Sequence, residues 1–231
     1  MATFSLKPKT ANIEAPSPEA ALDAYNAETQ LANPSGIPEF FQGDSSATQV
    51  RPPSLRIIGK TGRLCDQFPK NIGELVYDGE VILGSSVKAV VVSMKFGFEE
   101  TLAYGGDDLP ERWDSVADAK ASGKDYHPTA IVSLLLEMPE GIELGEQIDG
   151  KFYAPAVFYI KRFDVSTWNS ILKKDATLRY KGDPRKGLYT ISAKLIKGRA
   201  NSWYGPALAA AGNTPDKVYD FVVGQLNMPL A

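Results

Sequence analysis

Residues 74–98 read ELVYDGEVILGSSVKAVVVSMKFGF, and this stretch predicts the class of fold. Two short apolar runs, Glu74–Tyr77 and Glu80–Leu83, flank Asp78-Gly79, a dipeptide that strongly favours the two-residue turn of a β-hairpin. A longer strand is predicted over Val87–Phe98, where apolar side chains alternate with others. Hairpins in which each strand follows closely on the last indicate an antiparallel sheet.

More strands and several helices are predicted around this hairpin. The further predicted strands are Leu55–Ile58, Thr101–Tyr104, Thr129–Glu137, Phe152–Phe163 and Leu188–Lys197. Helices are predicted where capping residues precede apolar residues at helical spacing, over Leu109–Ser122, Asp164–Lys174 and Thr214–Leu226. The fold class is therefore mainly β (α+β), an OB-like antiparallel β-barrel with an inserted helix, a C-terminal helix and an extended N-terminal arm.

The chain divides into two parts by composition. Residues 1–50 are rich in Ala, Pro, Ser, Thr and Asn and predict a flexible arm, with a short helix starting at Ser17-Pro18. The alternative is an arm that reaches a neighbouring subunit and so supports homo-oligomerisation. Residues 51–231 form the predicted OB-like nucleic-acid-binding domain.

Composition and the lengths of the apolar runs bear on where in the cell the protein is expected. Of the 231 residues, 43% are hydrophobic, which supports a core, and Cys65 is the only cysteine, so no intramolecular disulfide can form. The longest apolar runs are too short to cross a bilayer, and no signal peptide is recognised near Lys7 and Lys9. We expect a cytoplasmic protein with no membrane partner.

The residues needed for catalysis are scarce. His127 is the only histidine, and Gly59-Lys60-Thr61-Gly62 lacks the upstream glycine of a phosphate-binding loop. Adjacent acids such as Glu99-Glu100 and Asp107-Asp108 could bind Mg²⁺, but such pairs are usually solvated. We expect no enzyme activity, no catalytic residues, no cofactor and no metal site, and keep a metal-dependent enzyme using Glu99–Asp114 as the weakest alternative.

Charge is strongly segregated along the chain. Residues 151–199 contain twelve Lys or Arg and three Asp, a balance of twelve minus three, or about +9, whereas the whole chain is at −3. Tyr, Phe and Trp are interleaved with these cations. Single-stranded nucleic acid needs both, because cations hold phosphates and aromatic rings stack on unpaired bases.

Three segments of this basic region contribute the candidate site. The strand Phe152–Phe163 is aromatic on both faces, so either face could be the core. The connection Lys173–Gly187 is predicted to be a basic loop that could close over a groove, and Gly198–Pro206 follows the last predicted strand. The candidate nucleic-acid-binding residues are Tyr153, Tyr159, Lys161, Arg162, Lys173, Lys174, Arg179, Tyr180, Lys181, Arg185, Lys186, Lys194, Lys197, Arg199, Trp203 and Tyr204.

The order of several short motifs resembles the bacteriophage single-stranded DNA-binding proteins with a decorated OB-fold. From Pro53 to about Val222, the motifs are PSLRII at 53–58, EVILG at 80–84 before the long strand, Trp113 with AKA at 119–121, the aromatic strand with its helix at Trp168–Leu172, and NSWYGP at 201–206. The resemblance implies a replication or recombination protein in an infected bacterial cytoplasm. The chain ends QLNMPLA, without the acidic tail of many single-strand binders, so we do not expect partner recruitment of that kind.

Two further hypotheses stand beside the metal-dependent enzyme. The first is a sequence-tolerant single-stranded DNA-binding protein, with RNA as an open alternative substrate. The second is a structural virion or assembly protein with no nucleic-acid role, in which the basic segment meets the acidic part of a neighbouring subunit. DNA binding at rising salt separates them, because counterion release makes phosphate contacts salt-dependent.

Overall fold

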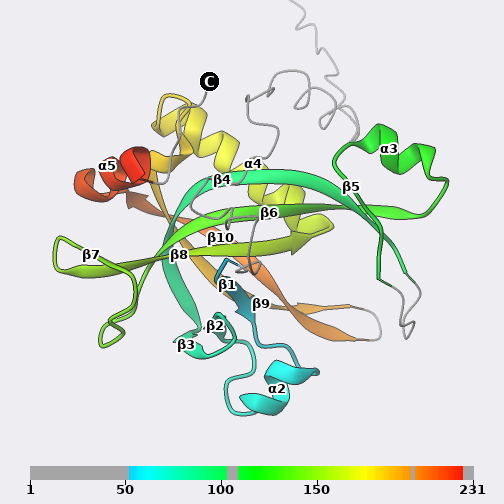
Figure 1. Cartoon of the computed structure of the whole chain (residues 1–231), viewed down its shortest axis with the longest axis horizontal. Coiled ribbons are helices and arrows are strands. Elements are labelled where there is room, and N and C mark those ends of the chain that lie inside the picture. The colour runs from blue at the N-terminus through cyan, green and yellow to red at the C-terminus, as the bar shows by residue number, and fades with distance from the viewer. Residues whose placement is uncertain (1–51, 103–108, 199–200, 226–231) are drawn as a thin grey trace, which may run out of the picture. The chain divides into compact units, whose positions relative to one another are not determined.

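The computed structural model describes residues 52–102, 109–198 and 201–225. This part of the chain is mainly β, with one strongly curled half-barrel sheet and a few helices, consistent with the predicted OB-like barrel (Figure 1). The predicted N-terminal arm, residues 1–50, lies outside the described residues.

Ten strands form the sheet in the described part of the chain. They are β1 (Ser54–Ile57), β2 (Leu75–Tyr77), β3 (Val81–Gly84), β4 (Ser86–Glu100), β5 (Arg112–Trp113), β6 (Tyr126–Glu137), β7 (Glu146–Ile148), β8 (Lys151–Lys161), β9 (Gly187–Lys197) and β10 (Ser202–Asn213). The main order is β10-β9-β4-β6-β8-β1-β2-β3, with β5 beside β4 and β7 beside β8. All neighbours are antiparallel except β1 and β8, which are parallel.

The predicted hairpin is confirmed. β2 and β3 pair antiparallel, and both residues of the turn, Asp78 and Gly79, have positive φ angles of 50° and 77°. Positive φ at both central residues is the geometry that favours Asp-Gly in such turns.

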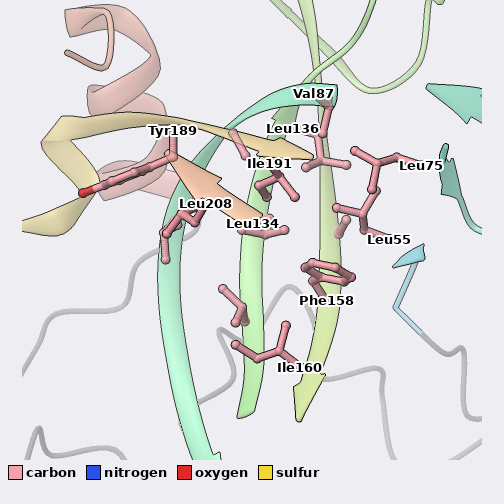
Figure 2. Close-up of a cluster of buried hydrophobic side chains, with 14 of the residues drawn as sticks. Leu55, Leu75, Val87, Leu134, Leu136, Phe158, Ile160, Tyr189, Ile191 and Leu208 are labelled. Carbon is pink, nitrogen blue, oxygen red and sulfur yellow. The ribbon is translucent and has the colours of Figure 1, made fainter. Parts of the chain in front are cut away.

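The helices of the described residues are α2 (Arg63–Gln67), α3 (Val116–Ala121), α4 (Phe163–Arg179) and α5 (Asp216–Gln225), with a 3₁₀ turn, η2, at Pro184–Lys186. Alternation along the strands produces two cores, one on each face of the sheet. The first core contains Phe158 and Ile160, which Figure 2 shows. Val165, Trp168 and Leu172 of α4 belong to the same core, so α4 covers this face. The face of β8 that packs in this core is therefore the one with Phe158 and Ile160.

The second core lies on the other face of the sheet. Val90, Leu135 and Leu188 pack there with Val218 and Val222 of α5. The two α5 residues are four positions apart, so they lie on one face of the helix. The C-terminal helix predicted over Thr214–Leu226 is therefore present, and it covers this side of the sheet.

Two predicted elements were wrong in part. The helix predicted over Leu109–Ser122 begins only at Val116, because Ser115 accepts a hydrogen bond from the Asp118 amide as its N-cap, whereas β5 pairs with β4. Thr101 and Leu102 are not in a strand. The rest of that predicted strand, Tyr104 included, lies outside the described residues.

Two corrections affect the candidate site directly. The basic connection predicted as a loop over Lys173–Gly187 is instead helical as far as Arg179, so α4 is five residues longer than predicted at its C-terminal end. The segment after β9 forms the strand β10, which was not predicted because Gly205, Pro206 and a run of alanines have low strand propensity. β10 is nevertheless paired along its length with β9.

Candidate functional site

A groove of about 620 Å³ opens where the curled sheet brings β10 back near β1 and the end of β8. Four strands separate β1 from β10 in the sheet order, so the curl alone makes this meeting possible. Besides these strands, single residues of α2, β6 and α4 line the walls. A volume in the range of about 300–1,000 Å³ is typical of small-ligand sites.

Besides the buried Phe158, three aromatic residues line the groove. Tyr159 comes from β8, and Trp203 and Tyr204 come from β10. Trp203 is 50% exposed, so one of its faces is available to a ligand. Tyr204 lies against Gly73, where an added Cβ would be 2.6 Å from the Tyr204 Cε1, so only glycine allows this approach.

Cations reach the groove from both walls. Lys161 of β8 and Arg56 of β1 line it, and both are exposed. Lys60, which follows β1, donates a hydrogen bond to the Ser202 Oγ of β10 and so connects the two walls.

Two further predicted lysines lie on the hairpin of β9 and β10, whose strand β10 lines the groove. Lys194 is opposite Gly205 and Lys197 is opposite Ser202 in the strand register, and both lysines are exposed. Facing residues in an antiparallel pair project from the same face of the sheet. Because side chains alternate along a strand, Lys194 lies on the face of Gly205 and Trp203, whereas Lys197 lies on the opposite face with Ser202 and Tyr204.

A buried carboxylate holds the groove residues of β8 in place. Glu99 of β4 has only 2% of its surface exposed and accepts a 2.6 Å hydrogen bond from the Tyr159 hydroxyl. It also forms ion pairs with Lys161 and with Arg112, whose Nε is 3.1 Å away. The Arg112 Cζ and the Lys161 Nζ lie 5.2 Å and 5.1 Å from the centre of the Tyr159 ring, within range of cation–π attraction.

The protonation states in this network follow from its contacts. Burial alone raises the pKa of Glu99, but hydrogen bonds from Lys161 and Tyr159 and the charges of Lys161 and Arg112 outweigh it, so the pKa is lowered. Burial, with the hydrogen bond to Glu99, raises the pKa of Tyr159 to about 12. Tyr159 therefore remains a donor to an ionised Glu99 at neutral pH.

His127 lies next to this network without joining it as a cation. Its Nε2 is 3.8 Å from the Glu99 Oε1, and its Nδ1 is 3.0 Å from the Thr101 Oγ1. Burial lowers the pKa of His127, and the charge of Arg162 lowers it further. At neutral pH the imidazole is uncharged, so the positive charge beside Glu99 comes from Lys161 and Arg112.

Asp164 is the one acidic residue among the lining residues of the described chain. It lies in the first turn of α4, half-buried, and burial raises the pKa of its carboxyl group. Gly205 of β10 lies next to it, since a Cβ there would be 3.6 Å from the Asp164 Oδ2, an ordinary contact distance.

The structure separates the predicted site residues into two groups. Tyr159, Lys161, Trp203 and Tyr204 line the groove. A second group lies at the far end of α4 and in the turn after it; we call it the basic end of α4, and its members are Lys173, Lys174, Arg179, Lys181, Arg185 and Lys186. Asp164 and Arg179 are fifteen residues apart on one helix, or about 22 Å at 1.5 Å per residue. The predicted cations of the second group therefore extend along α4 away from the groove, over a distance of up to about 22 Å.

Three predicted contact residues are not accessible. Tyr153 is 2% exposed and Tyr180 is 6% exposed, with the Tyr180 hydroxyl donating to the Gly212 carbonyl at 2.8 Å, so neither ring can stack on a base. Arg185 is held by Asp183, with Nε 2.7 Å from one carboxylate oxygen and Nη2 2.9 Å from the other. These three side chains are engaged in packing and hydrogen bonds within the protein.

The remaining predicted residues have different positions. Arg162 is exposed at the start of α4, where its φ of 56° lets the chain turn from β8 into the helix. Lys186 lies over the Tyr219 ring, 5.5 Å from its centre. Arg199 lies outside the described residues.

Several groove residues were not predicted. Arg56 and Lys60 were missed because the charge argument considered only residues 151–199. Asp164 was counted there only as an opposing charge, and Glu99 was interpreted as a solvated acid. The spacing of apolar residues gives no sign that β1 and β10 would meet. The one local signal was Glu99 itself, an acidic residue within a long apolar strand.

Within the described residues, no group of three or more His, Cys, Asp or Glu side chains could hold a metal ion. None of the described helices has the length and apolar composition needed to cross a membrane. Comparison with protein-family models, curated proteins and solved structures finds no match to this chain. Function therefore has to be argued from the groove.

Proposed function

We propose that this protein binds single-stranded DNA in the groove between β8 and β10, with little dependence on base sequence. The observation that carries the proposal is the meeting of three aromatic side chains with Lys161 and Arg56 in one groove. Unpaired bases stack on such rings, and the cations hold the phosphates between them.

The expected affinity follows from two contributions. Each base stacked on an aromatic side chain contributes about 1–3 kcal/mol, as measured by truncation, and this depends little on which base is stacked. Phosphate contacts add a contribution that weakens as salt rises. The rings of Tyr159, Trp203 and Tyr204 are sufficient for useful binding without hydrogen bonds to the bases.

Glu99 has a positioning role in this proposal. Its carboxylate fixes the Tyr159 hydroxyl and the Lys161 ammonium, so neither side chain has to be ordered when DNA binds. One carboxylate faces two cations, Lys161 and Arg112, which leaves about one positive charge in excess. The site therefore still attracts a phosphate.

The biological setting is part of the same proposal. An OB-like barrel with a cationic, aromatic groove fits a protein that protects single-stranded DNA during phage replication or recombination in the cytoplasm of a bacterial host. The resemblance of the ordered motifs to phage single-strand binders supports this setting. RNA binding and self-association through the N-terminal segment are alternatives, which titration of a labelled RNA oligonucleotide and light scattering test respectively.

The direct test is fluorescence anisotropy of labelled oligo-dT titrated with the protein at increasing salt. We expect micromolar or tighter binding at low salt and a steep fall in the association constant as salt rises. Absence of binding at low salt would overturn the proposal. A large oligomer of fixed size by light scattering, unchanged by DNA, would instead support an assembly protein.

A further inference from the structure

Asp164 is out of place in a groove built to hold phosphates. Every other charged lining residue of the described chain is a cation, namely Arg56 or Lys161. A carboxylate here repels the DNA backbone and should weaken binding that depends on phosphates alone. Gly205 lies two residues after Trp203 in β10, so both project to the same face, and a Cβ on Gly205 would lie 3.6 Å from the Asp164 Oδ2. Asp164 therefore lies on the Trp203 side of β10, where a base stacked on that ring, rather than a phosphate, would lie.

The Asp164 carboxylate also differs from the other buried acids in its surroundings. Glu99 and Asp183 each receive hydrogen bonds and ion pairs, and their pKa values are lowered. For Asp164, no ion pair or hydrogen bond to the carboxylate is found in the described part of the chain, and burial alone shifts its pKa upward. A partly desolvated acceptor without donors is unfavourable until a ligand supplies them.

We propose, resting on the function proposed above, that Asp164 reads the Watson–Crick edge of a base stacked in the groove and favours guanine over thymine. A carboxylate accepts hydrogen bonds and donates none. Guanine presents two adjacent donors, its N1–H and its N2 amino group, which match the two carboxylate oxygens. Unpaired bases in single strands are commonly recognised on this edge.

The other bases are expected to bind less tightly than guanine, in an order set by the hydrogen-bond donors that they present. Cytosine and adenine each offer one amino group beside a ring nitrogen that is itself an acceptor. Thymine offers one N–H between two carbonyl oxygens, both of which repel a carboxylate. Stacking on Trp203 and Tyr204 still allows every base to bind, so the result is a preference and not an exclusive specificity.

The test compares labelled oligo-dT with an oligonucleotide of equal length in which isolated thymines are replaced by guanine, avoiding guanine runs. We expect the intact protein to bind the guanine-containing strand more tightly by about five- to 150-fold, the discrimination typical of a bidentate contact. Inosine lacks the N2 amino group, so its substitution for guanine should remove most of the gain.

Substitutions at Asp164 test whether this residue causes the guanine preference. Asp164→Asn should lose the guanine preference and bind oligo-dT as well as or better than the intact protein, because a negative charge is removed. Asp164→Glu keeps the carboxylate and should retain part of the preference. Asp220→Asn, a change at an exposed acid of α5, is the matched control and should alter neither.

Each outcome of these titrations supports or overturns the role proposed for Asp164. Equal affinity for the two strands, or a guanine preference that survives in Asp164→Asn, would overturn the assignment while leaving the proposed function intact. Failure of the intact protein to bind either strand at low salt would overturn the proposed function and this inference together. Thermal unfolding of Asp164→Asn at the temperature of the intact protein would show that a lost preference is not a folding defect.

Discussion

The groove and the basic end of α4 lie at opposite ends of one helix, and both contain lysine, arginine and tyrosine. In the groove, Trp203 is half exposed and faces open space. At the basic end, Tyr180 is buried and donates to the Gly212 carbonyl. Of these two rings, the exposed Trp203 of the groove is therefore available to a ligand, whereas the buried Tyr180 of the basic end is not.

The paired carboxylates of the two regions show the same difference. Glu99 holds Tyr159 and Lys161, which line the groove. Asp183 holds Arg185 and accepts a 2.8 Å hydrogen bond from the Tyr219 hydroxyl, which connects α5 to the turn before β9. One acid supports a candidate binding surface, whereas the other supports packing. The comparison teaches that charge density along a sequence does not identify the surface that binds.

The largest expected effect comes from replacing Glu99 and Asp183 by their amides, one at a time. Glu99→Gln and Asp183→Asn should each lower the free energy of unfolding by about 1.5–3 kcal/mol, since each removes hydrogen bonds to a charged group. Urea denaturation measures this loss. Only Glu99→Gln should also weaken oligo-dT binding, because Tyr159 and Lys161 lose their support. Equal loss of binding in Asp183→Asn would break the distinction between the regions.

Truncation of the exposed ring should have the next largest effect. Trp203→Ala should weaken oligo-dT binding by about 1–3 kcal/mol, the contribution of one stacked base, and leave thermal stability nearly unchanged because Trp203 is half exposed. The matched control is Leu178→Ala, which removes an exposed apolar side chain of α4 near its basic end. Similar losses in anisotropy titrations of both variants would contradict the proposed groove.

The pH dependence of stability should reflect Glu99. Its pKa in the folded protein is lowered, so its contribution to stability is present above its unfolded value of about 4.3 and is lost as the pH falls through the folded pKa. Urea denaturation of the intact protein and of Glu99→Gln at pH values from about 7 to about 3 measures this contribution. The stability difference between them should shrink at the acid end; a constant difference would show that the Glu99 charge is not stabilising.

The smallest effect is expected for surface charge. Replacement of three groove cations, Arg56, Lys60 and Lys194, by glutamine should reduce the slope of log affinity against log salt by about 2, at about 0.7 per phosphate contact. Replacement of Lys174, Lys181 and Lys186 by glutamine removes the same charge from the basic end and should change the slope little. Equal changes of slope would mean that both regions contact the strand.

Much of the sheet could be predicted because its signals are local. Asp78-Gly79 determines a turn, and alternation in β4 and β8 predicts strands, without knowledge of distant residues. β10 could not be predicted in this way, since Gly205 and Pro206 form a strand only through pairing with β9. The length of α4 was missed because its basic second half was interpreted as a loop.

The candidate site was only partly predictable for the same physical reason. Tyr159 and Trp203 could be selected as aromatic residues among cations, but their meeting with Arg56 depends on the curl that brings β1 near β10. Exposure of a ring is likewise decided by packing, so Tyr153 and Trp203 look equivalent in sequence and differ in the structure.

The most direct test of the central claim, that a single strand stacks in this groove, is tryptophan fluorescence during titration with unlabelled oligo-dT. The chain has three tryptophans, of which Trp168 is fully buried and Trp203 lines the groove. We predict saturable quenching that is lost in Trp203→Phe, because a stacked base quenches the indole it covers. Binding detected by anisotropy with no change in Trp203 fluorescence would contradict the account.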